Sequence, residues 1–124
     1  MRIALLLAAV FSFVGTDATA QRMAPELSDL CAPTVRMMNG DTTLSQIELV
    51  KVNKCVSWVA GYLEAVGQMS AFGGTRVVCL PPDGVNGEIA IRLVMNFMRA
   101  HPEYQNQTAR SNMLAALQEF FPCK

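Results

Sequence analysis

The chain has 124 residues, and its 10 basic and 10 acidic side chains give it a formal charge of zero at pH 7. A general nucleic-acid binder needs surplus Lys and Arg to displace counterions from phosphates, so this balance argues against that class of protein. The balance also argues against an acidic, disordered solvating segment.

The N-terminal residues have the three parts of a secretory signal peptide. A positive start at Arg2 precedes an apolar stretch over residues 3–14, and residues 18–20 form an A-x-A cleavage site. The apolar stretch is too short to span a bilayer as a permanent helix. We therefore expect residues 1–20 to be removed, leaving residues 21–124 as one exported, soluble domain with a single modest core and no membrane contact.

The four cysteines are Cys31, Cys55, Cys79 and Cys123. An even number of cysteines in a short exported chain predicts two disulfides, with three connectivities that the sequence does not distinguish. We favour Cys31–Cys55 with Cys79–Cys123, because this pairing ties each end of the chain to a neighbouring element. A zinc site is the rival interpretation, but the chain has no C-x-x-C pair and only one histidine. We therefore expect no metal and no cofactor.

The first half of the domain is predicted to contain a short helix and a long one. A polar lead-in over residues 21–30 opens the short helix, which Pro33 ends. The long helix begins near Thr43 or Ser45. Gly61 lies inside it at a cost of about 1 kcal/mol relative to Ala, which suggests close packing against another element. Its buried face is predicted from apolar residues at helical spacing, namely Val52, Cys55, Val56, Val59, Leu63, Val66 and Met69.

The second half is predicted to contain an extended connector over residues 76–80 and two further helices. Asn86 caps a third helix that ends before Pro102, and a last helix covers roughly residues 108–120. A third helix this apolar is either central to the core or covered by a partner subunit, so a homodimer is one of two alternatives. The predicted fold is a small, disulfide-linked all-α domain of about four helices. The apolar residues that surround most of the third helix are Ile89, Ile91, Leu93, Val94, Met95, Phe97 and Met98.

The chemistry-bearing side chains do not form a catalytic pattern. His101 is the only histidine, and at the end of a helix we expect it to interact with free carbonyls and the helix dipole. Glu88, Glu103 and Glu119 are scattered over polar faces, and their spacing gives no acid/base pair. Trp58 is expected to anchor the core. The sequence therefore predicts that the protein is not an enzyme.

Two polar segments are candidates for binding a partner. The first is a glycine-rich loop that lacks the spacing of a phosphate-binding loop. Loops on rigid scaffolds often carry binding function, so we expect this one to contact a protein partner. The second is a polar turn after the third helix. The candidate residues are Gly73, Gly74, Thr75 and Arg76 in the loop, and Glu103, Tyr104 and Gln105 in the turn.

Several motifs together resemble a known family. They are Cys55-x-x-Trp58-x-x-Gly61-Tyr62, Cys79-Leu80-Pro81-Pro82-Asp83-Gly84-Val85, Ala100-His101-Pro102-Glu103 and Ala116-Leu117-x-x-Phe120-Phe121-Pro122-Cys123. In their order and spacing they resemble the Rap/Tai family of periplasmic immunity proteins, which protect bacteria against amidase effectors of type VI secretion. The resemblance covers roughly residues 50–123.

This resemblance implies a small helical protein, often dimeric, that binds a peptidoglycan amidase effector and blocks its active site. It implies a periplasmic location and no enzymatic activity. It also implies that the shared motif residues are mostly scaffold and that the effector contacts lie elsewhere. The alternative is a periplasmic helical chaperone or stress-response binding protein without a toxin partner.

Overall fold

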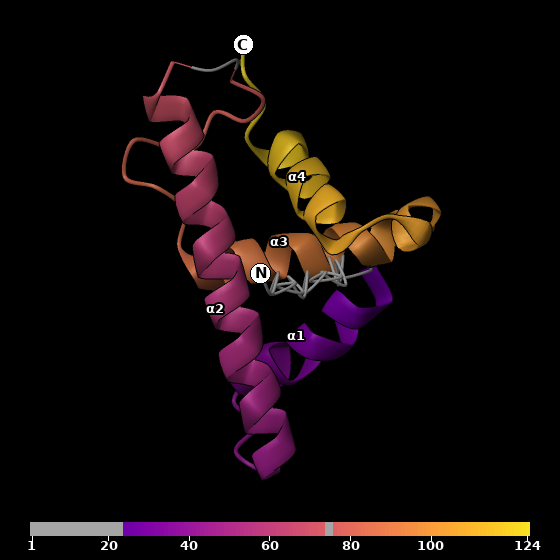
Figure 1. Cartoon of the computed structure of the whole chain (residues 1–124). Helices are drawn as coiled ribbons and strands as arrows, with labels where there is room; N and C mark the ends of the chain where they lie inside the picture. The colour runs from indigo at the N-terminus through magenta and orange to yellow at the C-terminus, as the bar shows by residue number, and fades with distance from the viewer. Residues whose placement is uncertain (1–23, 74–75) are drawn as a thin grey trace, which may run out of the picture.

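The structure is a computed structural model that describes residues 24–73 and 76–124, in which four α-helices and one short 3-10 helix are present (Figure 1). The predicted all-α class is therefore confirmed. The predicted signal peptide, residues 1–20, lies outside the described residues. The elements are α1 (Ala24–Met38), α2 (Gln46–Ala71), α3 (Gly87–Ala100), η1 (Pro102–Asn106) and α4 (Ala109–Phe120).

Helix α1 continues past Pro33 to Met38, so the predicted end of this helix is wrong. Proline keeps a helical φ and costs one intrahelical hydrogen bond together with a clash at the preceding turn. Tertiary packing outweighs that cost here. Pro33 is buried, as are Leu30 and Cys31 on the same helix, and a disulfide fastens Cys31 to α2.

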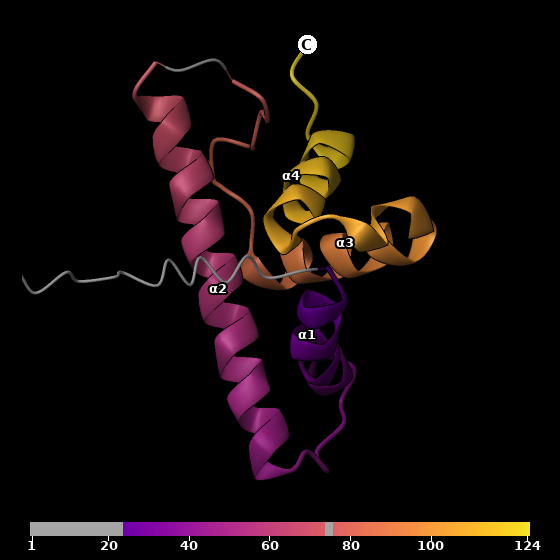
Figure 2. The same cartoon turned by 45° about the vertical axis from the view of Figure 1, so that its right-hand side comes forward.

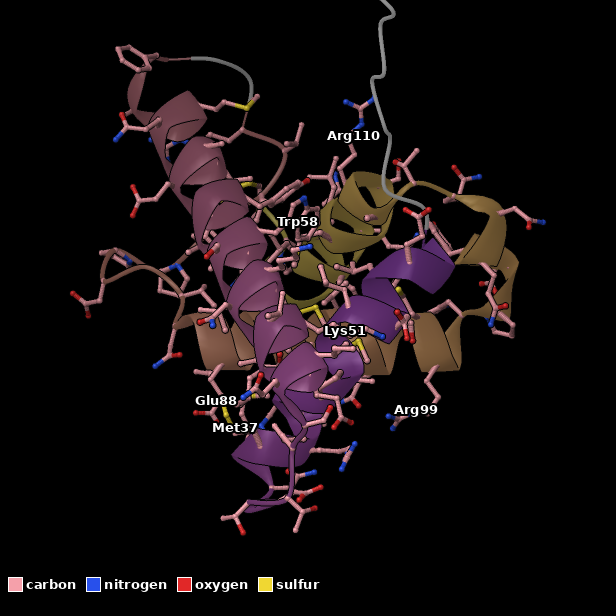
Figure 3. All side chains as sticks on the ribbon, turned by 60° about the horizontal axis from the view of Figure 1, so that its bottom comes forward. Met37, Lys51, Trp58, Glu88, Arg99 and Arg110 are labelled. Atoms are coloured by element: carbon pink, nitrogen blue, oxygen red, sulfur yellow. A yellow bond between two sulfur atoms is a disulfide. The ribbon has the colours of Figure 1, made fainter. Side chains whose placement is uncertain are left out.

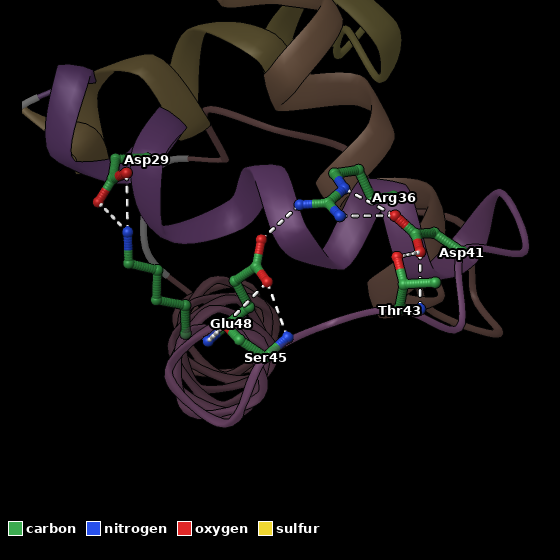
Figure 4. A network of polar contacts seen from close by, with 7 residues as sticks. Asp29, Arg36, Asp41, Thr43, Ser45 and Glu48 are labelled. Carbon is green, nitrogen blue, oxygen red and sulfur yellow. Dashed lines mark hydrogen bonds and ion pairs between the residues drawn. The ribbon is translucent and has the colours of Figure 1, made fainter.

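Helix α2 begins as predicted, with Ser45 as its N-cap. The Ser45 hydroxyl accepts a hydrogen bond from the Glu48 backbone N–H at 3.3 Å, and the Glu48 carboxylate accepts one from the Ser45 backbone N–H at 2.8 Å. This capping box satisfies two backbone donors that a helix start otherwise leaves open. Arg36 at the end of α1 pairs with Glu48 and with Asp41, as Figure 4 shows. The start of α2 is therefore tied to the end of α1.

The turn between α1 and α2 carries a strongly perturbed carboxylate. The Thr43 hydroxyl and backbone N–H donate to Asp41 at 2.7 and 2.8 Å, and the Arg36 guanidinium donates at 2.8 Å. These hydrogen bonds, first those of Thr43 and then that of Arg36, lower the pKa of Asp41 to about 2. A second ion pair joins Lys51 of α2 to Asp29 of α1 at 2.8 Å.

The buried face of α2 is narrower than predicted. Val52 and Val59 are buried, but Val56 is 44% exposed and Met69 is 62% exposed. For Met69 the reason is visible in Figures 1 and 2, where the C-terminal half of α2 extends beyond α3. Gly61 is exposed, and apart from the adjacent backbone of α2 no heavy atom of the described chain lies within 4 Å of the position that a Cβ would take. The predicted close packing of this glycine against another element is therefore wrong.

Helix α3 is the centre of the fold. It contacts α1, α2, α4 and η1, and its start is capped as predicted, because Asn86 Oδ1 accepts from the Glu88 backbone N–H at 2.7 Å. Because α3 contacts all the other helices and buries most of its apolar residues, a central position in the core explains its apolar character. The remaining large apolar residues are less buried: Ile89 is exposed, and Leu93 and Met95 are half-buried. The buried residues of α3 are Ala90, Ile91, Val94, Phe97 and Met98.

Both disulfides form in the favoured pairing, so that prediction is confirmed. Cys31–Cys55 joins α1 to α2 with a Cα–Cα distance of 5.2 Å, and Cys79–Cys123 joins the connector to the end of the chain with 5.0 Å. The first is fully buried, whereas Cys79 is half-buried and Cys123 exposed.

None of the helices that the structure describes has both the length and the hydropathy of a membrane span.

Candidate partner-binding surface

The connector between α2 and α3, defined from here on as residues 77–86, is fixed to α4 although it has no regular secondary structure. The Cys79 backbone N–H donates to the Phe121 carbonyl at 3.0 Å, and the Gln118 side chain donates to the Val77 carbonyl at 3.2 Å. A turn after Pro81 is closed by the backbone N–H of Gly84, whose φ of 77° lies in the region that favours glycine. With the Cys79–Cys123 disulfide, these contacts hold the connector in one shape.

An open groove of about 580 Å³ runs between this connector and the C-terminal half of α2. Glu64 and Asp83 supply negative charge to it and Arg76 supplies positive charge. The connector motif that the sequence resemblance treated as scaffold supplies most of one wall. The lining residues are Leu63, Glu64, Gly67 and Gln68 of α2, together with Arg76 and residues 78–86. That this motif lines a groove was not predicted from the sequence, although the Pro-Pro-Asp-Gly turn is a signal for exposed backbone.

The first predicted binding segment is only partly described. Gly74 and Thr75 lie outside the described residues, while Gly73 adopts a φ of 73° just after α2. Arg76 is exposed and lines the groove. It also lines a smaller, mainly apolar hollow of about 120 Å³ between α2 and α4 that includes Leu114. Arg76 therefore stands between two recesses of the surface.

The second predicted segment lies in η1, at the end of α3 that is far from the end of α2 (Figures 1 and 2). The two predicted segments therefore do not form one surface. Glu103 is bound by His101 at 3.1 Å, and the half-buried Tyr104 packs edge-on against Phe97 at 5.0 Å between ring centroids. Gln105 is exposed and lines a separate hollow of about 560 Å³ beside α1.

His101 has a structural role, but its partners differ from the expected helix carbonyls. Its Nδ1 lies 3.1 Å from Glu103 Oε1, its Nε2 lies 3.1 Å from Glu119 Oε2, and its ring stacks on Phe97 at 4.4 Å. Each ring nitrogen of His101 therefore faces a carboxylate oxygen, one from η1 and one from α4. Hydrogen bonds from the backbone of Glu103 and then from His101 lower the pKa of Glu103.

Through Glu103 and Glu119, His101 joins η1 to the last turn of α4; these contacts are called the His101 clamp. The clamp was not predicted from the sequence, because its two carboxylates come from different elements. No signal in the sequence links Glu119 to His101. Within residues 24–73 and 76–124, no group of three or more His, Cys, Asp or Glu side chains is placed to hold a metal ion.

The projecting half of α2 is braced against α4 by aromatic residues. Trp58 is half-buried and its ring lies 5.5 Å from that of Tyr62, as measured between centroids. The Tyr62 hydroxyl donates to the Arg110 carbonyl at 3.0 Å, and burial raises the pKa of Tyr62. Figure 3 shows Trp58 between α2 and the start of α4, where Arg110 lies. Trp58 thus supports the position of α2 from the edge of the core.

The fold and surface define a small, disulfide-linked helical domain with open grooves on its surface. The chain belongs to the Rap1a immunity protein family, whose model matches residues 23–123. The match begins before the motifs of residues 50–123 and includes all of α1. No curated protein and no solved structure matches the chain significantly.

Membership of this family implies immunity against an effector of a type VI secretion system, and it confirms that the protein is not an enzyme. It favours an immunity role over the chaperone alternative. The two disulfides suggest an oxidising compartment outside the cytoplasm.

Proposed function

We propose that the protein is a periplasmic immunity protein that binds and occludes a peptidoglycan amidase effector of a type VI secretion system. The observation that carries the proposal is the family match over residues 23–123, a range that contains all four helices and both disulfides. The Rap/Tai-like motifs supply the amidase as the class of effector. The signal-like residues 1–20 support the periplasm, where a wall-cleaving enzyme acts on its substrate.

The surface that we propose for the effector is the connector wall of the groove together with Arg76. The connector is held by a disulfide and by hydrogen bonds to α4, so little conformational entropy is lost when a partner binds it. Arginine is enriched among residues that dominate binding energy. The exposed Pro81 and Pro82 add rigid apolar contact area beside it.

The η1 turn is the weaker candidate for this role. Glu103 and Tyr104 are engaged by His101 and Phe97, so a partner would have to compete with contacts inside the chain. Only Gln105 of the three predicted residues is exposed without a structural contact of this kind.

The test is inhibition of an amidase effector encoded beside this protein. With the mature, oxidised chain, we expect binding by calorimetry and loss of peptidoglycan hydrolysis at a one-to-one ratio of binding sites. Arg76→Ala should weaken binding by at least about tenfold, as expected for a residue at a binding hot spot. Gln105→Ala is the matched control at the other predicted segment and should leave the affinity unchanged.

Two results would contradict the proposal at different levels. An adjacent amidase that stays fully active with excess protein would refute amidase immunity. Inhibition that is lost in Gln105→Ala and kept in Arg76→Ala would leave amidase immunity intact and move the contact surface to η1.

A further inference from the structure

The small hollow of about 120 Å³ lies where α2, α4 and the connector meet. In Figure 2 the connector runs between α2 and α4. Val78 is buried in the wall of this hollow, whereas Met69 and Val77 are 62% and 44% exposed. The hollow therefore combines a buried apolar wall with an exposed apolar rim. Its lining residues are Tyr62, Val66 and Met69 of α2, Arg76, Val77 and Val78, and Leu114 of α4.

The walls of this hollow are tied to one another by contacts within the chain. The Tyr62 hydroxyl donates to the Arg110 carbonyl at 3.0 Å, which joins α2 to α4. The Gln118 side chain donates to the Val77 carbonyl at 3.2 Å, and the Cys79–Cys123 disulfide follows two residues later in the connector. A hollow whose walls are already fixed loses little conformational entropy when a side chain enters it.

The size and the lining of the hollow fit a single apolar side chain. An apolar cavity of about 150 Å³ binds one benzene molecule, so a hollow of about 120 Å³ has room for about one aliphatic or thioether side chain. Burial of such a side chain against apolar walls is favourable. Met69 at the rim has a flexible side chain that adapts its shape to what it covers.

Arg76 adds a positive charge to this apolar site. Among the described residues that line the hollow, it alone is charged at pH 7, because Glu64 and Asp83 line the neighbouring groove instead. Arg76 is exposed and belongs to no ion pair within the described part of the chain. An unpaired guanidinium beside an apolar hollow is complementary to a partner segment that carries a carboxylate next to an apolar side chain.

We propose that this hollow receives one aliphatic or methionine side chain of the effector, from a segment that also places an Asp or Glu carboxylate on Arg76. The inference rests on the proposed function and deepens it, because it names the chemistry that the effector presents. It also extends the effector surface from the connector and Arg76 to α4, through Leu114.

The test measures, by calorimetry, the affinity of the adjacent amidase effector for variants of the mature, oxidised protein. Val77→Trp puts a bulky side chain at the hollow and should weaken binding by at least about tenfold, the change expected when one such side chain is no longer buried. Val56→Trp is the matched control and should leave the affinity unchanged, because Val56 is also 44% exposed but lines neither the hollow nor the groove. Met69→Asp is a second variant, at an exposed position, and should also weaken binding. Circular dichroism of every variant checks that the fold is retained.

Substitutions in the effector give the decisive readout. One exposed apolar residue of the effector, when changed to Ala, should weaken binding to the unmodified protein but not weaken it further in Val77→Trp, because effects of groups in contact are not additive. Changing a neighbouring Asp or Glu of the effector to Lys should restore binding to Arg76→Glu.

Three results would contradict the inference, and they are distinguishable. Full affinity of both Val77→Trp and Met69→Asp, or additive effects for every effector substitution, would overturn the inference and leave the proposed function intact. A change in the association state of Val77→Trp, measured by sedimentation velocity, with unchanged effector affinity would assign the hollow to a second copy of the chain. An unmodified protein that does not bind the amidase would overturn the proposed function and this inference with it.

Discussion

The Cys79–Cys123 disulfide should stabilise the domain and also hold the binding surface in shape. It closes a loop with a sequence separation of 44 residues. In the chain-entropy model, closing a loop of this length lowers the entropy of the unfolded state and so stabilises the folded state by about 4 kcal/mol at 25 °C. Domains of this size have a free energy of unfolding of about 5–15 kcal/mol, so the double variant Cys79→Ala/Cys123→Ala should lose a large share of it.

The Cys31–Cys55 disulfide offers a matched comparison because neither of its cysteines lines the groove. Its separation of 24 residues corresponds to about 3.5 kcal/mol in the same model. Urea denaturation of the two double variants should therefore show similar losses of stability. Effector binding, measured where both variants are folded, should fall only when Cys79 and Cys123 are replaced, since only that disulfide holds the connector.

The two disulfides should also differ in their response to reductant. Cys31 and Cys55 have no exposed surface, whereas Cys123 is exposed. A mild thiol should open Cys79–Cys123 first, as measured by mass spectrometry after alkylation.

A stability loss below about 1 kcal/mol for either double variant would refute the entropic reasoning. Equal loss of binding in both variants would refute the special role of the connector.

Three further predictions concern the core, a helix cap and the response to acid. Leu117 has no exposed surface, so Leu117→Ala should lower the free energy of unfolding in urea by about 2–5 kcal/mol, and a loss under about 1 kcal/mol would show that the site collapses without a cavity. Ser45→Ala removes the capping box of α2 and should cost about 1 kcal/mol by thermal denaturation, whereas Ser45→Gly should cost less. Asp41 has its pKa lowered from 3.8 to about 2 by Thr43 and then Arg36, so its stabilising contribution is fully present above pH 3.8 and is lost as the pH falls through 2. Asp41→Asn should therefore lower the melting temperature at pH 6 and lower it much less near pH 2, where the Asp41 carboxyl is already about half protonated in the folded protein. An equal effect at both pH values would contradict this assignment.

Local signals were sufficient to predict where most helices begin and end. Ser45, Asn86 and Thr108 were predicted at or near helix starts, and each accepts a hydrogen bond from the first turn of its helix. These interactions involve residues two or three positions apart, so they are encoded in short stretches of sequence. The end of α3 at His101, before Pro102, is encoded in the same way.

The predictions that failed concern the balance between a local cost and distant packing. Pro33 carries a local penalty that would end an isolated helix, yet burial and the Cys31–Cys55 disulfide continue α1 past it. Gly61 was expected at a close contact, but α2 projects from the core and leaves this glycine exposed. Neither outcome could be read from the residues near the position itself.

The sequence by itself determined the helical class, the helix starts and the presence of four cysteines able to form two disulfides. Only the tertiary structure decided which cysteines pair, which face of α2 stays open, and that Glu103 and Glu119 meet at His101. The physical reason is the sequence separation over which each interaction acts. Capping and helical periodicity act within a few residues, whereas disulfide pairing, the groove and the clamp at His101 depend on how separate helices pack around α3.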